Sequence, residues 1–180
     1  VYAVGKYPGP KNEMTFSFAS EEFVEQDGYL VGTLGALPVF SNKLMRLARS
    51  AGLSAVSGRL PRVMGMFTKI GDSPGGAIDI QERITKTYLP EDEEKFRKGT
   101  EACKNILLRA GADPDSFMVQ HNVGGHPGGT AAIGNVVNPQ LETFAVKNLF
   151  VCDASVFPRS PGRPPTLTII SLAKYLAKTL

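Results

Sequence analysis

The sequence contains no tryptophan and only two cysteines and two histidines among its 180 residues. Cys103 and Cys152 stand far apart and neither belongs to a C-x-x-C pair, so neither a zinc knuckle nor a thioredoxin-type motif is supported. We expect two buried thiols in a reducing compartment, and therefore a cytoplasmic protein. His121 and His126 lie in a glycine-rich segment without a third ligand nearby, so we expect no metal site.

Long apolar runs are also missing. No run approaches ~18 apolar residues, and no charged-then-apolar leader opens the chain, so we expect no membrane span, no secretory signal and a soluble chain. The basic residues form no stripe with interleaved aromatics, which argues against a nucleic-acid partner. Residues 121–180 carry the whole net charge of +3, so this segment could accept an anionic ligand.

The composition that is present is typical of a globular domain, with 42% hydrophobic residues. At this length a chain can bury a sizeable core. The 19 glycines and 13 prolines gather in clusters and mark the turns. Strand composition is found in four segments between these clusters, and the last two are predicted to form an antiparallel hairpin around the turn at 71–76. The four segments are residues 14–18, 29–33, 65–70 and 77–87.

Helical patterns alternate with these strands. A short acidic stretch at 21–28 is predicted to form either a turn or a short helix. Residues 41–52 are predicted to form a short helix. The strongest element is a helix over 90–110, with proline and acidic residues in its first turn and Gly111 after its end. Its predicted inward stripe consists of Phe96, Gly99, Cys103, Ile106, Leu107 and Ala110.

Two segments carry most of the chemical signal. In the first, glycines surround His126, and Pro127 favours an extended backbone at the histidine, so that the imidazole is presented from a shaped loop. An imidazole is a natural base near neutral pH. A loop histidine bonded to a carbonyl explains this segment equally well.

The second segment begins with an apolar run at 148–153, which predicts a buried strand that ends in Asp153. A turn and a proline-rich helix start follow, and residues 166–180 form a helix that is apolar on most sides. This order brings a carboxylate and a helix N-terminus to one sheet edge, where anionic cofactors bind. An ordinary strand, loop and helix would give the same pattern.

Together these segments resemble the C-terminal region of the glucose-methanol-choline (GMC) family of flavin-dependent oxidoreductases. The resemblance rests on H-P-x-G-T from His126 to Thr130, a glycine at 134, N-L-x-V-x-D-A-S-V-F-P at 148–158, and P-x-x-T-I at 165–169. Each piece alone is a weak signal. Their order within 45 residues is specific, and the upstream strands and the helix over 90–110 also look like the family's substrate-binding half.

The resemblance implies an FAD cofactor and an alcohol or sugar substrate. In the family, the histidine of H-P-x-G-T takes the alcohol proton while hydride passes to flavin N5, and this role would fall on His126. The resemblance also implies that Asp153 and Ala154 line the flavin, and that Pro165 and Thr166 approach its ring.

Two features depart from the family pattern. Pro164 stands where members usually carry a second histidine or asparagine, so we expect His121 or Asn122 to orient the substrate instead. Residues 1–60 contain no G-x-G-x-x-G, so the chain looks like the part of such an enzyme that lacks its N-terminal FAD-binding domain.

The resemblance therefore implies an α+β fold, a mostly antiparallel sheet backed by helices, with a C-terminal strand-loop-helix that belongs to the missing flavin domain. We expect a substrate-binding (cap) domain at 1–133 and a C-terminal segment returning to the FAD-binding domain at 134–180. The isolated chain should be inactive and should form a homo-oligomer through its exposed C-terminal helix. The alternative is a non-catalytic binding or assembly module derived from the same cap domain.

Overall fold

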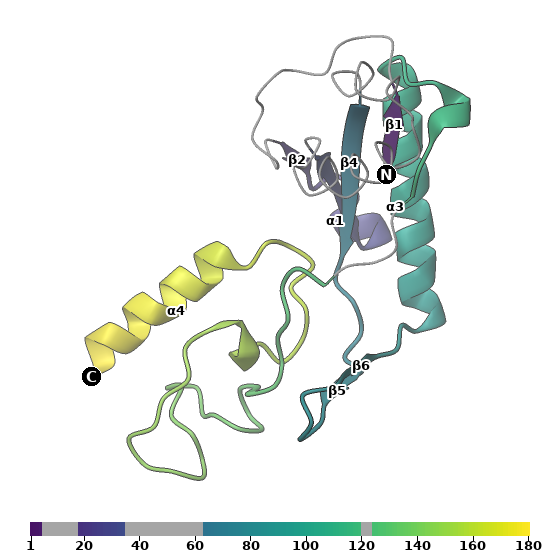
Figure 1. Ribbon diagram of the computed structural model, residues 1–180. Helices are drawn as coiled ribbons and strands as arrows, with labels where there is room; N and C mark the ends of the chain where they lie inside the picture. Colours follow the sequence, from purple (N-terminus) through teal and green to yellow (C-terminus); the bar gives the residue numbers. More distant parts are fainter. Residues whose placement is uncertain (5–17, 35–62, 120–123) are drawn as a thin grey trace, which may run out of the picture. The chain divides into compact units, whose positions relative to one another are not determined.

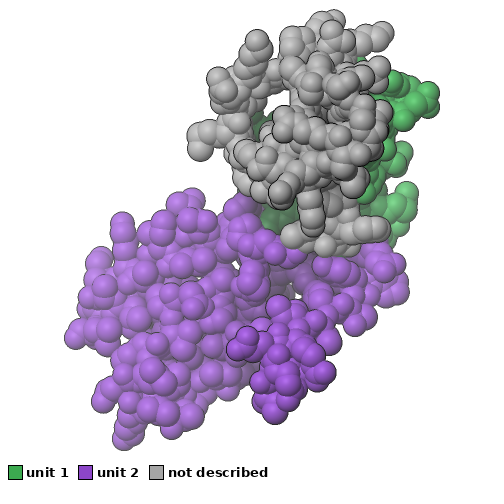
Figure 2. All heavy atoms as spheres, in the orientation of Figure 1, with its two compact units in different colours: residues 1–69, 94–121 green, residues 70–93, 122–180 purple. Residues whose placement is uncertain are grey.

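The computed structural model describes residues 1–4, 18–34, 63–119 and 124–180 (Figure 1). Two compact units divide the chain, and the chain passes between them more than once. Unit 1 comprises residues 1–69 and 94–121, and unit 2 comprises residues 70–93 and 122–180; Figure 2 colours them green and purple. The predicted helix at 41–52 lies outside the described residues, and so does the predicted strand at 14–18 except for Phe18, which directly precedes β2. The predicted boundary at 133/134 stays a prediction.

Unit 1 contains a four-stranded sheet in the order β1-β4-β3-β2. The strands are β1 (Tyr2–Val4), β2 (Ala19–Ser20), β3 (Tyr29–Thr33) and β4 (Val63–Ile70). β1 pairs antiparallel with β4, and β2 pairs antiparallel with β3. The predicted strand at 29–33 is confirmed, and the acidic stretch before it forms the short helix α1 (Val24–Asp27). The antiparallel α+β class predicted from the resemblance is correct.

The long helix α3 (Pro90–Arg109) confirms the strongest element predicted from the sequence. Its start is favoured by proline in the first turn and by three acidic residues at the positive end of the helix dipole. Cys103 and Leu107 are buried against the sheet of unit 1, as the predicted stripe requires. Ile106 and Ala110 are exposed, so the buried stripe is narrower than predicted.

The predicted hairpin between 65–70 and 77–87 is wrong. β4 pairs with neighbours in its own sheet, whereas β5 (Gly76–Ile78) pairs with β6 (Ile84–Lys86), so the hairpin spans residues 76–86. Asp79 closes this turn, because its carboxylate accepts hydrogen bonds from the backbone N–H groups of Gln81 and Arg83, both at 2.9 Å. A short side-chain turn of this kind outweighs the glycine-rich segment at 71–76.

Unit 2 has little regular structure outside this hairpin and its last helix. Its core is formed by three fully buried residues, Val137, Leu141 and Val156. The apolar run at 148–153 is not the predicted buried strand: it makes a single antiparallel bridge, between Glu142 and Phe150, and Leu149 is half exposed. Leu141 adopts φ +67°, so the backbone bends where a continuous ladder would require extended residues.

The final helix α4 (Thr166–Thr179) confirms the predicted C-terminal helix. Leu172 and Leu176 pack against the unit 2 core. Ile169 is half-buried, whereas Leu167 and Ile170 are exposed by 78% and 46%. Among the described residues, no helix is both long and apolar enough to cross a membrane.

Candidate functional site

His126 lies on an exposed loop of unit 2 that contains little but glycine, proline and the histidine itself. A side chain built on Gly124 or Gly125 would meet no atom within 4 Å, so the chain just before the histidine borders open space. The predicted exposed loop is therefore present. His121 and Asn122, which we expected to assist His126, lie outside the described residues.

The loop after His126 is bound to the segment that follows Asp153. The N–H groups of Gly129 and Ala131 both donate to the carbonyl of Ser155, at 3.1 and 3.0 Å, and Ile133 N–H donates to the carbonyl of Val156 at 2.9 Å. We call these three bonds the loop latch. They join two sequence motifs that stand more than twenty residues apart in the chain.

Gly128 shows why this contact needs glycine. A Cβ atom at this position would lie 2.7 Å from the carbonyl oxygen of Ala154, closer than real Cβ contacts allow. Any larger residue would push the loop away from the turn. Gly128 is therefore required by backbone packing against the second motif, in addition to any contact with a ligand.

Asp153 lies within this second motif and is the N-cap of the 3-10 helix η4 (Ala154–Val156). Its Oδ1 accepts a hydrogen bond from Ser155 N–H at 2.8 Å. Hydrogen bonds from Ser155 hold the pKa of the Asp153 carboxyl below its ordinary value. The group is exposed, so an ionised carboxylate is presented to solvent beside the loop latch.

Pro165 and Thr166 lie at the start of α4. Pro165 is buried and is the N-cap residue of the helix, while Thr166 is exposed and is its first helical residue. They follow Gly162, whose backbone packs against Gly71. The structure thus brings the His126 loop and the Asp153 turn together through the latch, and it anchors the Pro165 turn to a different segment of unit 2.

Other candidate centres offer less chemistry. Burial raises the pKa of the Cys103 thiol to about 11, which disfavours a thiolate nucleophile. In the ranges that the structure describes, no group of three His, Cys, Asp or Glu residues could hold a metal ion. A shallow depression in unit 1 has no titratable residue in its lining: Phe18, Ala19, Ser20, Val31, Gly32, Thr33, Met66 and Ile106.

One residue was missed by sequence reasoning. Asp92 reads as one of several acidic residues in the first turn of α3, yet it is fully buried. The signal that could have distinguished it is its position three residues after Leu89, where a carboxylate can accept from the N–H that precedes the helix. Leu89 N–H does donate to Asp92 Oδ2, at 3.4 Å.

Comparison with known proteins gives a match to a family model described as GMC oxidoreductase, over residues 68–173. The chain is 30% identical over 122 residues to the uncharacterized protein MJ1450 of Methanocaldococcus jannaschii. The aligned region covers 66% of this chain and 30% of that protein. The chain is also 27% identical over 152 residues to the long-chain-alcohol oxidase FAO4A of Arabidopsis thaliana. The aligned region covers 64% of this chain and 21% of that oxidase.

Among solved structures, the chain is similar to pyridoxine 4-oxidase from Mesorbium loti, with a TM-score of 0.67 and 17% identity. That similarity covers 99% of this chain and 40% of the oxidase, and at this identity it establishes the fold. The chain spans less than a third of the length of both the archaeal protein and the plant oxidase.

Proposed function

This chain belongs to the GMC oxidoreductase family, and from that premise we propose that it is the C-terminal, substrate-binding part of an FAD-dependent oxidoreductase acting on CH–OH groups. Its partner in that role is an N-terminal FAD-binding domain, and its substrate is a small alcohol or sugar. Residues 1–133 form the substrate-binding part in this proposal, and residues 134–180 complete the flavin domain.

The loop latch is the observation that carries the proposal. Gly129, Ala131 and Ile133 donate three backbone hydrogen bonds to the turn that follows Asp153. Backbone bonds position a loop more firmly than a flexible side chain does, because fewer torsions remain free. The histidine motif and the carboxylate motif are therefore held as one assembly, as an acid/base group beside a cofactor requires.

The residues of this assembly fit a flavin in their chemistry. Asp153 presents an exposed carboxylate with a lowered pKa, which can accept hydrogen bonds from flavin hydroxyl or N–H groups. Open space at Gly124 and Gly125 leaves room for a ligand at the backbone. We assign Asp153, Ala154, Pro165 and Thr166 to the flavin site. When bound, FAD supplies the hydride acceptor at N5.

His126 supplies the base in the proposed reaction. The imidazole accepts the hydroxyl proton of the substrate as the carbon–hydrogen bond gives up its hydride, which leaves an aldehyde or ketone. General-base assistance of this kind contributes on the order of 10² to 10⁴ in rate. Pro164 has no side-chain donor or acceptor with which to assist, so His121 or Asn122 is the proposed partner that orients the hydroxyl.

The experiment uses the protein joined to its N-terminal flavin-binding domain and loaded with FAD, which we call the flavin-loaded protein. Reduction of its bound flavin by an alcohol is followed by stopped-flow spectroscopy. His126→Ala should slow reduction by at least ~10²-fold while FAD stays bound, because the imidazole acts in the transition state. Added imidazole should restore part of the lost rate. The matched control is Gln26→Ala, an exposed polar residue of unit 1, which should leave the rate unchanged.

Three results would oppose the proposal. A His126→Ala rate within a few fold of wild type would remove the assignment of the base. Failure of imidazole to restore activity would show that the histidine acts through structure. A protein that binds no flavin in any form would favour the non-catalytic binding module.

A further inference from the structure

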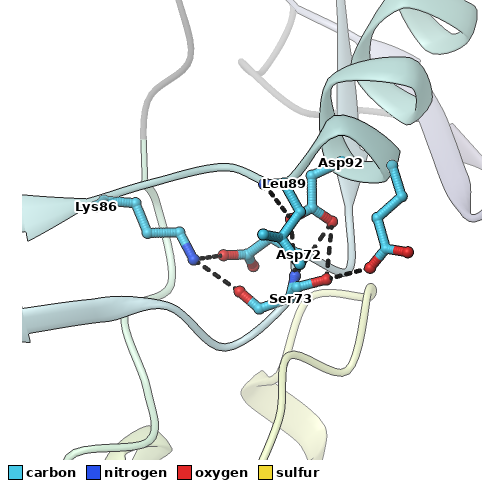
Figure 3. Close-up of polar contacts among 6 residues, drawn as sticks. Asp72, Ser73, Lys86, Leu89 and Asp92 are labelled. Carbon is cyan, nitrogen blue, oxygen red and sulfur yellow. Dashed lines mark hydrogen bonds and ion pairs between the residues drawn. The ribbon is translucent and has the colours of Figure 1, made fainter.

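Asp92 lies in the first turn of α3. Among the described residues, it is the one carboxylate residue that is fully buried. A buried carboxylate is tolerated when hydrogen-bond donors surround its oxygens. Ser73 N–H donates to both oxygens at 3.1 Å. The Ser73 hydroxyl makes its shorter bond to Glu91 Oε1, at 2.7 Å, and lies 3.3 Å from Asp92 Oδ1. Figure 3 shows these bonds together with the one from Leu89 N–H. Asp92 therefore fixes the backbone of Ser73 as well as the start of the helix.

Ser73 is also held from the hairpin. Lys86 Nζ, on β6, donates to the Ser73 carbonyl at 2.9 Å and forms an ion pair with the Asp72 carboxylate (Figure 3). We call Asp72, Ser73, Lys86 and Asp92 the Asp92 clamp. It connects the helix start, the hairpin and the turn between β4 and β5, all within unit 2.

Gly71, directly before the clamp, touches the segment that leads to α4. A Cβ at Gly71 would lie 3.1 Å from Gly162 Cα and 3.2 Å from Gly162 N, which is tighter than nearly all real contacts. Gly162 itself has φ +68°, a conformation that disfavours other residues. Two backbones thus pack directly on each other, three residues before Pro165.

We propose that Asp92 is a positioning residue, which acts through Ser73 and Gly71 to hold the turn at 162–166 against residues 71–73, within unit 2. This turn ends in Pro165 and Thr166, which the proposed function assigns to the flavin site. The predicted effect of Asp92 on catalysis therefore rests on that proposed function. The loop latch holds the histidine side of the site, and the Asp92 clamp holds the helix side. Neither Asp92 nor Ser73 touches a reacting group in this proposal.

The first test needs no flavin and uses assigned amide spectra of the 180-residue chain. Asp92→Asn removes one acceptor oxygen and should displace the amide resonances of Gly162, Arg163 and Thr166. Glu93→Gln makes the same chemical change at the next, exposed residue of the helix and should leave those resonances in place. Equal effects of the two substitutions, or none from Asp92→Asn, would overturn the proposal.

A second pair of variants keeps the proposal falsifiable if Asp92→Asn fails to fold. Gly71→Ala places a methyl group against the Gly162 backbone, whereas Gly75→Ala meets its nearest atom, the Thr87 carbonyl, at an ordinary 3.4 Å. In the amide spectra, Gly71→Ala should displace the resonances of Arg163 and Thr166, and Gly75→Ala should not. The same result from both variants would contradict the direct packing of Gly71 on Gly162 through which Asp92 is proposed to act, and would overturn the proposal.

The flavin-loaded protein provides the catalytic readout. Gly71→Ala should alter the visible circular dichroism of the flavin and lower its limiting reduction rate by about 10-fold or more, since a shift of about 1 Å can cost 10²-fold. Unchanged dichroism and rate alongside displaced amide resonances would refute the positioning role. Loss of flavin reduction in the wild-type protein itself would instead refute the proposed function, while the amide spectra would still test the clamp.

Discussion

Unit 1 and unit 2 bury their apolar residues by different means. Unit 1 buries Leu30 and Val31 of β3 and Cys103 of α3, and the regular hydrogen bonding of its four-stranded sheet satisfies the strand backbones. Unit 2 has a core of three fully buried residues, surrounded by loops and single bridges. Many of its large apolar side chains are exposed: Ile78, Ile80, Ile84, Val136, Phe144, Val146, Leu149, Leu167, Ile170 and Tyr175.

Unit 2, which carries the proposed base His126 and the proposed flavin-site residues, therefore buries less of its apolar surface within itself than unit 1 does. Its loops are held by specific backbone bonds, such as the loop latch, and by the Asp92 clamp. Large apolar side chains exposed on one unit are what a surface covered by another layer of protein would carry. This difference fits the proposal that unit 2 completes its core against a flavin-binding domain.

Core truncations should separate the two units most strongly. Leu30→Ala in unit 1 and Leu141→Ala in unit 2 each remove a side chain with no exposed surface, and each should cost about 2–5 kcal/mol in the free energy of unfolding. Hydrogen exchange should show that Leu141→Ala exposes the amides of the loop latch while β3 stays protected. Equal loss of protection in both units from either variant would mean that they unfold as one.

Self-association should depend on α4. Its exposed Leu167 and Ile170 should drive the chain into oligomers in sedimentation experiments, and replacing both with serine should yield monomers. Leu108→Ser, an exposed leucine of α3 in unit 1, is the control and should leave the oligomer intact. A wild-type chain that sediments as a monomer at tens of micromolar, the order of concentration at which exposed apolar surface associates, would contradict this expectation.

Two equivalent caps allow a smaller and sharper comparison. Asp113 caps a 3-10 helix in unit 1, η3 (Pro114–Ser116), as Asp153 caps η4 in unit 2. Alanine at either position should cost about 0.5–2 kcal/mol in stability. Asp153→Ala alone should also weaken flavin binding by the flavin-loaded protein. Equal flavin affinity in the two variants would remove Asp153 from the proposed site.

The Asp153 cap should also depend on pH. Its pKa in the folded state lies below the ordinary aspartate value of 3.8. Its stabilising contribution is therefore complete above that value and is lost as the pH falls through the lower, folded-state pKa. Thermal unfolding below about pH 4 should show this loss, and Asp153→Asn should abolish the part that Asp153 contributes.

The sequence predicted the elements whose signals are local. The proline and acidic residues that start α3 act within one turn, and β3 and α4 follow from composition and periodicity. The hairpin was misplaced because the glycine-rich turn at 71–76 has a tertiary role: it packs on Gly162 and is bound by Asp92. Sequence spacing does not reveal such a contact between segments about ninety residues apart.

The proposed site rests on residue types that the sequence supplies, and only part of its arrangement could be predicted. Family-like motifs identified His126 and Asp153, but the loop latch between them depends on backbone bonds that no side-chain pattern encodes. The run at 148–153 is as apolar as a buried strand, yet the backbone bends at Leu141 and Asn148, which have φ of +67° and +61°. Asp92 was overlooked because an acidic first turn is ordinarily solvated.

The central claim is that unit 2 carries one half of a flavin site, with the other half supplied by a flavin-binding domain. The most direct test is titration of the 180-residue chain with FAD, followed by flavin fluorescence. Because the chain shows no pattern for the pyrophosphate or ribose, we predict weak binding or none, whereas the protein joined to its flavin-binding domain should hold FAD tightly. Micromolar or tighter binding of FAD by the 180-residue chain alone would contradict the account.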